Sequence, residues 1–393
     1  MNTYTNKNRF FGEIIDTHLQ DRYVKDLSDK TSNLCDIDYV YRFNYKKCNV
    51  VSQLEKTGIV GNKWLQYKSF VNWCKKNNKL VPDYIPETYL IKKDELDSDF
   101  LRSLFVEKKK WIVKPENASF RAGIKVVNEY DKLMSWINSY NNNKWIIQDY
   151  IDHPLKLENK KIHFRIYVLL VKTRKYADVY IYNKGYIFTS LKPYDINSLD
   201  DDSNLSGGDS WEQMRLYPNT FVKEYGLEKY KFILPQINTI VKDTMLCCMD
   251  NLQCINKKVD NYKCYKLLGY DILINEDFKL FLGEINSRTV NVKFPIKNMY
   301  NNILDIVTSK NRVTNEYLYT NNINFYSVIN KTYKSAKFSE EEQTQEHNQD
   351  KELEIVGGGD CLDLLKKNPL HLILISVFIV ILFLMFKNFL KRN

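Results

Sequence analysis

The chain has 393 residues, of which 44% are hydrophobic and 14% aromatic, and its formal net charge is +10. This composition excludes a wholly disordered chain and predicts a substantial core. Acidic residues gather near the end, at 339–354, so the preceding body is more basic than the total and favours an acidic polypeptide, an anionic membrane or nucleic acid.

Residues 1–110 form the first block, which we interpret as an N-terminal lobe. Its clearest element is a helix over 64–76, where Trp64, Tyr67, Val71 and Cys74 recur at helical spacing after Asn62, a candidate N-cap. The run "VPDYIPETYLI" follows, and its two prolines predict extended chain.

The same block opens without an apolar signal core, and the eight cysteines of the chain include no CxxC pair. We therefore expect reduced thiols and a main body in the cytosol.

Residues 111–151 form a central lobe that reads strand, loop, strand, helix, strand. Lys114 ends the apolar strand "WIVKP" beside "ENASFRAGI", a loop of small residues that includes Gly123. A lysine at that place can hold phosphates while backbone N–H groups close over them. Gln148 interrupts the later strand "KWIIQDYI", either as an amide for an adenine or as an ordinary edge residue.

Residues 152–330 form a third block with a polar loop, "DDSNLSGGDS", and a helix expected after Pro235. In "KIHFRIYVLLV" the strand alternation places Lys161, His163 and Arg165 on one face. Three nitrogenous side chains in a row suit a polyphosphate, and the alternative is an exposed edge strand.

The block closes with "YDILI" and "LFLGEIN", two apolar runs that predict a hairpin. A four-residue loop, 276–279, places Asp271 opposite Glu284, with Asn286 on the same face. Two opposed carboxylates repel each other unless a cation lies between them, and with an amide oxygen they suit Mg²⁺. The alternatives are a solvated sheet face or a carboxylate paired with Arg288.

Two segments follow the third block. Residues 331–368 predict an acidic, flexible linker. Residues 370–386, "LHLILISVFIVILFLMF", are almost wholly apolar and at about 1.5 Å per residue reach the lower limit for a membrane span. We predict a single-pass transmembrane tail anchor that leaves the main body in the cytosol.

Between about residues 80 and 291 the chain resembles the tubulin–tyrosine ligase and tubulin polyglutamylase group of the ATP-grasp fold. The resemblance rests on "VPDYIPETYLI", "WIVKP", "WIIQDYIDHPL", "KKIHFRIYVLL", "YIYNKGYIFTS" and "LLGYDILINEDFKLFLGEIN", in this order. It implies an α+β fold of N-terminal, central and C-terminal lobes.

The resemblance also implies an ATP-dependent carboxylate–amine ligase. Such an enzyme phosphorylates a carboxylate of an acidic acceptor protein, such as a tubulin tail, and the amine of a free amino acid attacks the acyl phosphate. ATP and Mg²⁺ are implied, and nucleic acid is not expected as a partner. The implied ATP-binding residues are Lys114, Gly123, Gln148, Asp149, Tyr150, Ile151, Lys161, His163 and Ser206; the implied catalytic residues are Lys161 and Arg165; the implied metal ligands are Asp271, Glu284 and Asn286.

The chain departs from the family pattern at several site positions. Arg121 in "FRAGI" stands where the family has the first glycine of its loop, and His163 stands where it has an Asp. The segment "GYIFTS" lacks an Arg that the family uses near the γ-phosphate, although Lys192 follows. These departures support an alternative hypothesis: a catalytically impaired ATP-grasp scaffold that binds ATP or an acidic partner at a membrane.

Overall fold

The computed structural model describes residues 3–7, 24–25, 34–37, 50–52, 54–96, 98–106, 109–118, 121–207, 211–254, 262–287 and 296–333, with side chains from residue 50 onward except at 211, 296 and 297. The chain divides into two units, residues 1–337 and 338–393, and the second lies outside the described residues.

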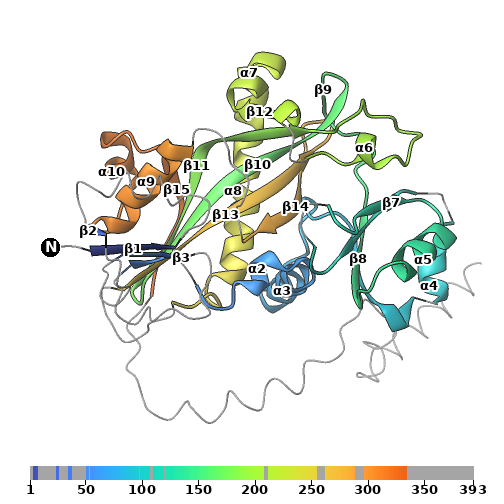
Figure 1. Cartoon of the computed structure of the whole chain (residues 1–393), viewed down its shortest axis with the longest axis horizontal. Helices are drawn as coiled ribbons and strands as arrows, with labels where there is room; N and C mark the ends of the chain where they lie inside the picture. Colours follow the sequence, from blue (N-terminus) through green and yellow to red (C-terminus); the bar gives the residue numbers. More distant parts are fainter. Residues whose placement is uncertain are drawn as a thin grey trace, which may run out of the picture. The chain divides into compact units, whose positions relative to one another are not determined.

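A large, mostly antiparallel sheet forms the centre of the first unit (Figure 1). Its long strands are β10 (Lys160–Lys172), which pairs with β11 (Tyr176–Thr189) on one side and β13 (Lys263–Ile274) on the other. The remaining strands of this sheet are β12 (Met214–Tyr217), β9 (Lys156–Leu157), β14 (Leu280–Asn286), β15 (Phe325–Thr332), β4 (Val50–Val51), β3 (Leu34–Ile37), β1 (Thr3–Lys7) and β2 (Val24–Lys25).

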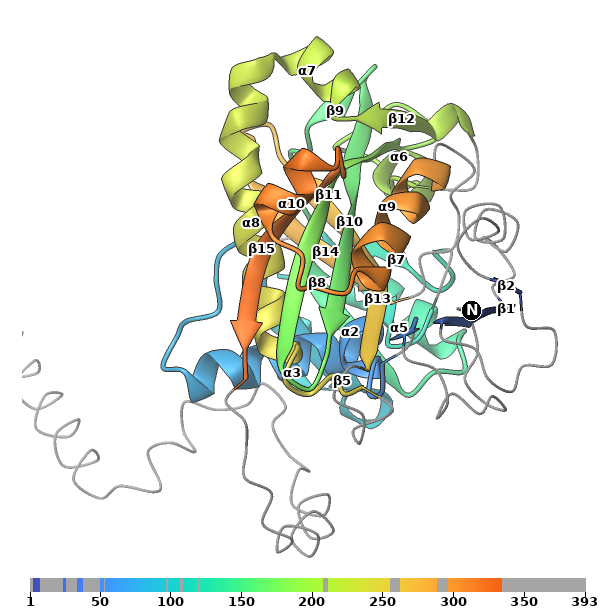
Figure 2. The ribbon, with the colours of Figure 1, turned by 90° about the vertical axis from the view of Figure 1, so that its left-hand side faces the viewer.

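Helices cover both faces of the long strands, because these strands are apolar on both faces over much of their length. Ile162 and Phe164 pack with α8 (Leu227–Cys248) and α3 (Lys63–Lys76), whereas Leu169 and Val171 pack with α9 (Ile296–Thr308). Figure 2 shows α8 and α9 on opposite sides of β10 and β11. Near the start of β10, the face opposite Ile162 and Phe164 carries the polar residues Lys161, His163 and Arg165.

A smaller sheet has the order β5–β8–β6–β7. Its strands are β5 (Thr88–Lys92), β8 (Lys144–Asp149), β6 (Trp111–Pro115) and β7 (Lys125–Val127). One face buries Trp111, Val113 and Trp145 against α5 (Tyr130–Asn138) and the residues that follow α4 (Asp99–Ser103). Since side chains alternate along a strand, Lys114 and Gln148 project from the opposite face.

Several short elements complete the described part of the chain. They are α2 (Gly58–Gly61), the 3₁₀ helix η2 (Lys93–Glu95), α6 (Asp201–Asn204), the 3₁₀ helix η3 (Trp211–Gln213), α7 (Asn219–Tyr225) and α10 (Asn315–Thr320).

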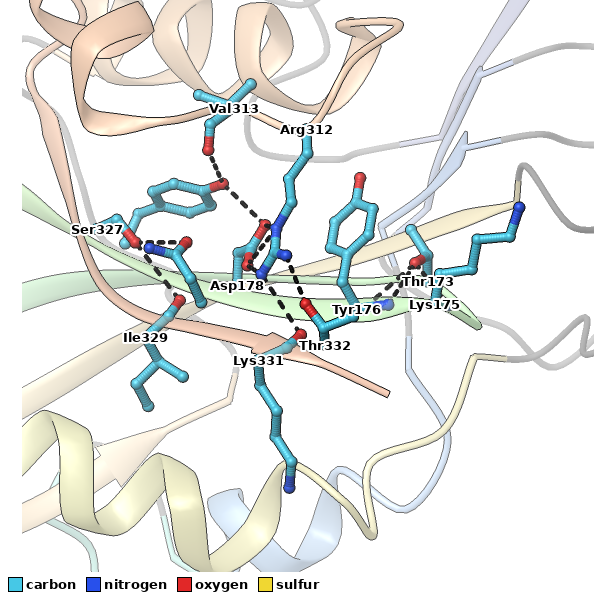
Figure 3. A network of polar contacts seen from close by, with 12 residues as sticks. Thr173, Lys175, Tyr176, Asp178, Arg312, Val313, Ser327, Ile329, Lys331 and Thr332 are labelled. Carbon is cyan, nitrogen blue, oxygen red and sulfur yellow. Dashed lines mark hydrogen bonds and ion pairs between the residues drawn. The ribbon is translucent and has the colours of Figure 1, made fainter. Parts of the chain in front are cut away.

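A buried ion pair fastens the end of the sheet to the segment after α9 (Figure 3). Asp178 of β11 is fully buried, and Arg312 donates to both of its carboxylate oxygens, with Nε at 2.9 Å from Oδ2. Tyr180 Oη donates to Asp178 Oδ2 at 3.3 Å, and Arg312 Nη1 donates to Thr332 Oγ1 of β15 at 2.9 Å. The arginine therefore joins three segments that are distant in sequence.

The predicted α+β class is confirmed, and so is the predicted first helix. This helix is α3, and the Asn62 side chain accepts a hydrogen bond from Leu65 N at 2.9 Å, as an N-cap does. The helix expected after Pro235 begins earlier, at Leu227, and contains the proline in its first turns. The edge-strand alternatives are wrong, because β10 and β8 each have a partner on both sides.

The predicted tail anchor, 370–386, and most of the predicted linker, 331–368, lie outside the described residues. Within the described ranges, no helix is long and apolar enough to cross a membrane.

Candidate active site

The predicted pairing of Asp271 with Glu284 is confirmed, but the hairpin achieves it differently from the prediction. Ile274, and not Asn275, faces Leu280, so a regular ladder would place Asp271 opposite Gly283. The ladder slips by one residue at Gly283, a β-bulge that brings Glu284 opposite Asp271. A methyl group at residue 283 would lie 2.9 Å from the Asp271 carbonyl oxygen, so only glycine fits this close approach.

Each carboxylate of this pair is held by a cation of the protein itself. Arg165, the cross-strand neighbour of Asp271 on β10, donates to both oxygens of Asp271, with Nη2 at 3.0 Å from Oδ2. Lys63 Nζ, at the start of α3, lies 3.1 Å from Glu284 Oε2. Asn286 Nδ2 donates to both carboxylates, to Asp271 Oδ2 and Glu284 Oε1, each at 3.0 Å.

The site is too enclosed to be a solvated sheet face. The side chains of Asp271 and Glu284 are 14% and 24% exposed. Burial raises the pKa of Asp271, and Arg165 opposes this effect. The pKa of Glu284 is lowered although burial acts to raise it, because the ammonium groups of Lys63 and Lys114 stabilise its charged form. The alternative partner, Arg288, lies outside the described residues.

Two buried lysines lie in this region: Lys114 interacts with the acidic pair, and Lys161 lies near Lys114 and Asp152. Lys114 Nζ donates to Gln148 Oε1 at 2.8 Å and to the bulged Gly283 carbonyl at 3.3 Å. Lys161 Nζ lies 3.8 Å from the centre of the Tyr150 ring. Burial lowers the pKa of Lys114 to about 8 and that of Lys161 to about 7. Both lysines are thus placed where a positive charge is costly unless an anion arrives.

His163 stands between the loop residue Ser206 and the acidic pair. Its Nδ1 lies 2.7 Å from Ser206 Oγ, and its Nε2 lies 3.7 Å from Asp271 Oδ1. Burial, together with the positive charges of Arg165 and Arg121, lowers its pKa to about 3. The ring is therefore neutral at physiological pH, and it stacks on Phe188 with a centroid distance of 5.2 Å.

The loop between β6 and β7 contributes two left-handed backbone positions. Gly123 has φ of 72°, and a methyl group there would lie 2.9 Å from Pro115 Cγ, so glycine is required. Arg121 has φ of 60° and approaches Gly207 with its guanidinium. Arg121 and His163, the two departures from the family pattern, therefore lie on the same side of the site.

The segment predicted to hold an adenine is partly engaged within the protein. Asp149 N donates to Glu87 O at 2.8 Å, and the Asp149 carboxylate pairs with Lys109 Nζ at 3.1 Å. Tyr150 N donates to Lys110 O at 3.3 Å. Ile151 follows directly and is half-buried. Gln148 itself is buried, and its amide positions Lys114 and donates to Thr88 Oγ1 at 2.8 Å.

A cleft opens behind Lys114, between the smaller sheet, β14, α3 and α8, with about 640 Å³ of space when adjoining solvent is counted. Its lining includes the polar residues Lys63, Gln66, Thr88, Lys114, Gln148 and Thr244. The apolar lining comes from Ile59, Val60, Phe70, Ile85, Ile146, Leu282 and Ile285. The cleft is therefore suited to a ligand with both an anionic and an apolar part.

The structure brings most of the predicted residues together: Lys114, Gln148, Lys161, His163, Arg165, Ser206, Asp271, Glu284 and Asn286. Sequence reasoning missed Lys63, which also donates to Ala118 O at 2.9 Å. A lysine at the first position of an amphipathic helix carries no sequence signal of its own. In the described part of the chain, no group of three or more His, Cys, Asp or Glu side chains could hold a metal ion, so the candidate set depends on the Asn286 amide.

Comparison with known proteins gives the site a context. The model of the tubulin-tyrosine ligase family matches residues 42–316, which is more than half of the chain. The chain is 28% identical to tubulin glycylase 3F of Tetrahymena thermophila over 199 residues, which are 45% of this chain and 21% of that protein.

Two further relatives also match part of the chain at similar identity. The probable alpha-tubulin polyglutamylase Ttll1 of Tetrahymena thermophila is 27% identical over 252 residues, 55% of this chain and 57% of the relative. The tubulin monoglycylase TTLL3 of Mus musculus is 25% identical over 200 residues, 45% of this chain and 21% of the relative. The chain thus spans from about a fifth to somewhat over half of the length of these relatives.

Proposed function

We propose, because the chain belongs to the tubulin-tyrosine ligase family, that it is an ATP-dependent ligase that joins a free amino acid to a carboxylate of an acidic protein. The expected fold is of the ATP-grasp type, with the nucleotide between the smaller sheet and β14. The proposed reaction goes through an acyl phosphate on the acceptor, and the attacking amine then releases phosphate.

The observation that carries this proposal is the burial of several cations in one region: Arg165, Lys63 and Lys114 act on the acidic pair, and Lys161 lies near Lys114. Lys114 and Lys161 are 7% and 4% exposed, and both have lowered pKa values. Buried lysines of this kind destabilise a ligand-free protein, and such groups are concentrated at functional sites. A polyphosphate would supply the missing negative charge and restore the ordinary protonation of both ammonium groups.

The residues of the acidic pair fit Mg²⁺. Asp271, Glu284 and Asn286 offer hard oxygen ligands within one small region, and the cations of Lys63 and Arg165 already lie against the two carboxylates. Asn286 now directs its amide nitrogen at both carboxylates, so its amide group has to turn over to present oxygen to a metal ion. Bound Mg²⁺ would neutralise phosphate charge during transfer.

Arg165 and Lys161 would hold negative charge at the reacting end of the site. The Arg165 guanidinium, which donates to Asp271, would bind the transferred phosphoryl group or the acceptor carboxylate. The acceptor is proposed to be an acidic protein tail, since the body of the chain is basic and the named relatives act on tubulin.

A transfer assay with the full chain tests the proposal. Labelled glycine, glutamate or tyrosine is supplied with Mg-ATP and tubulin, and incorporation is compared among wild type, Glu284→Gln and Glu228→Gln. Glu228 forms an exposed ion pair with Lys231 on α8, so its variant is the matched control. Incorporation that Glu284→Gln abolishes and Glu228→Gln keeps supports the ligase. Mg-ATP binding without incorporation of any amino acid would favour the scaffold alternative.

The prediction that residues 370–386 anchor the chain in a membrane, with the body in the cytosol, is kept as part of the proposal. Its support is the apolar sequence of that segment. The full chain should sediment with membranes and resist extraction at high salt, and a chain that ends at residue 369 should remain in the supernatant. Sedimentation of the shortened chain would contradict the anchor.

A further inference from the structure

The segment "GYIFTS" presents an aromatic ring, and no charge, to the candidate site. Its residue Phe188 faces His163 across the β10–β11 ladder. The two rings are stacked, with 16° between their planes, and the Arg165 guanidinium carbon lies 5.6 Å from the centre of the Phe188 ring. This strand therefore contributes a flat apolar floor to the part of the site next to His163.

A second arginine reaches the same region from the other sheet. A methyl group built on Gly207 would lie 3.1 Å from His163 Cε1 and 3.9 Å from Arg121 Nη2, so both side chains approach one point. The Nε and Nη2 atoms of Arg121 are shielded from solvent. Arg121 is also among the positive charges that lower the pKa of His163. The loop thus brings the Arg121 guanidinium close to His163, which stacks on Phe188.

The backbone of Arg121 has an unfavourable conformation for a residue with a long side chain. Its φ of 60° lies in the left-handed region, which a long side chain seldom adopts and glycine adopts freely. Strained positions of this kind concentrate at functional sites. Glycine or asparagine would suit the turn better, so the turn alone does not explain an arginine.

We propose that Arg121 binds the terminal phosphoryl group of the nucleotide and so supplies the charge that Phe188 does not. The planar guanidinium fork matches a phosphoryl group. Arg121 and His163 approach the same point at Gly207, and His163 Nε2 lies 3.7 Å from Asp271 Oδ1. This inference rests on the proposed function and specifies which loop residue of this chain binds the terminal phosphate.

Nucleotide binding by the full chain tests the inference without a requirement for turnover. The affinities for Mg²⁺ with a non-hydrolysable ATP analogue and for Mg²⁺ with ADP are measured by calorimetry for wild type, Arg121→Asn and Arg121→Lys. Asparagine tolerates the left-handed backbone and removes the charge, whereas lysine keeps it. Arg121→Asn should weaken the ATP analogue about tenfold or more and leave ADP nearly unchanged, and Arg121→Lys should fall between.

A rescue variant separates a phosphate contact from a role in holding the loop. Adding Phe188→Arg to Arg121→Asn should restore part of the preference for the ATP analogue, because a guanidinium returns to the same region. Arg121→Gly, which suits the observed φ, serves as a second charge-free variant if Arg121→Asn folds poorly.

The outcomes are distinct. Equal weakening of ATP analogue and ADP, or unchanged affinity for both, would overturn the role of Arg121 while the proposed function stands. Failure of the wild-type chain to bind either nucleotide would overturn the proposed function and this inference with it.

Discussion

Asp271 and Glu284 face each other across β13 and β14, and the extra residue Gly283 makes that pairing possible. The bulge also turns the Gly283 carbonyl toward Lys114 Nζ, 3.3 Å away. One backbone irregularity therefore sets the positions of two carboxylates and one ammonium group.

Gly283→Ala should damage the site and the fold together. The added methyl group would lie 2.9 Å from the Asp271 carbonyl oxygen, so the hairpin has to shift, at a cost of about 1–3 kcal/mol. We expect a lower melting temperature and a large loss of Mg-ATP affinity. Gly58→Ala is the control, since its methyl group meets only Leu65 Cδ1 at 3.9 Å. Wild-type binding by Gly283→Ala would show that the bulge is dispensable.

Lys63→Met should create a protein that responds more strongly to divalent metal. The substitution leaves Glu284 without its cation at 3.1 Å and beside the Asp271 carboxylate. The ligand-free melting temperature should fall, and Mg²⁺ alone should raise it more than in wild type, because the metal ion takes the place of the ammonium group. Lys231→Met, which removes an exposed ion pair, should show neither effect. An unchanged response to Mg²⁺ would argue against a metal site here.

Lys161→Met should stabilise the ligand-free chain in a pH-dependent way. The pKa of Lys161 is lowered from 10.5 to about 7 in the folded protein, chiefly by burial. Below pH 7 both folded and unfolded chains carry the charge, so burial costs stability in full. Between pH 7 and 10.5 only the unfolded chain is protonated, and wild-type stability rises with pH.

The methionine variant should therefore be more stable than wild type at about pH 6, and this advantage should shrink toward about pH 9. Urea unfolding across that range measures it, with the exposed Lys192→Met as control. A difference that is constant with pH would contradict the buried, deprotonated lysine. Lys161→Met should also bind Mg-ATP more weakly.

Arg312→Met should lower stability without an effect on nucleotide binding. Asp178 is fully buried, and removal of its cation leaves an unpaired carboxylate, with an expected loss of about 3 kcal/mol in the free energy of unfolding. Asp178 and Arg312 belong to a network that shares no residue with the candidate site (Figure 3). Denaturant unfolding and nucleotide calorimetry on the same sample check both statements. A change in Mg-ATP affinity without a change in stability would contradict them.

The sequence allowed the candidate site to be predicted well where it depends on alternation along strands. The shared face of Lys161, His163 and Arg165 follows from a period of two. The pairing of Asp271 with Glu284 was predicted from the same period but depends on the bulge at Gly283. The turn of the hairpin was predicted one residue out of register, because a bulge breaks that period. The glycine inside an apolar strand was the signal that could have indicated it.

What depends on distant parts of the chain could not be predicted in this way. The contact of Lys63 with Glu284 joins residues from α3 and β14, and local patterns carry no information about such a contact. The strand β15, which pairs with β11, was also not predicted. Nor were the helices α9 and α10, which cover the second face of the large sheet. Tertiary packing decided these elements.

Lys114 belongs to β6 of the smaller sheet, and its ammonium group donates a hydrogen bond to the backbone of β14 in the larger sheet. A nucleotide whose phosphates attract this ammonium group would compete with its hydrogen bond to the Gly283 carbonyl. Nucleotide binding would then weaken one of the contacts between the two sheets. Each catalytic cycle would then break and re-form the hydrogen bond between Lys114 and Gly283.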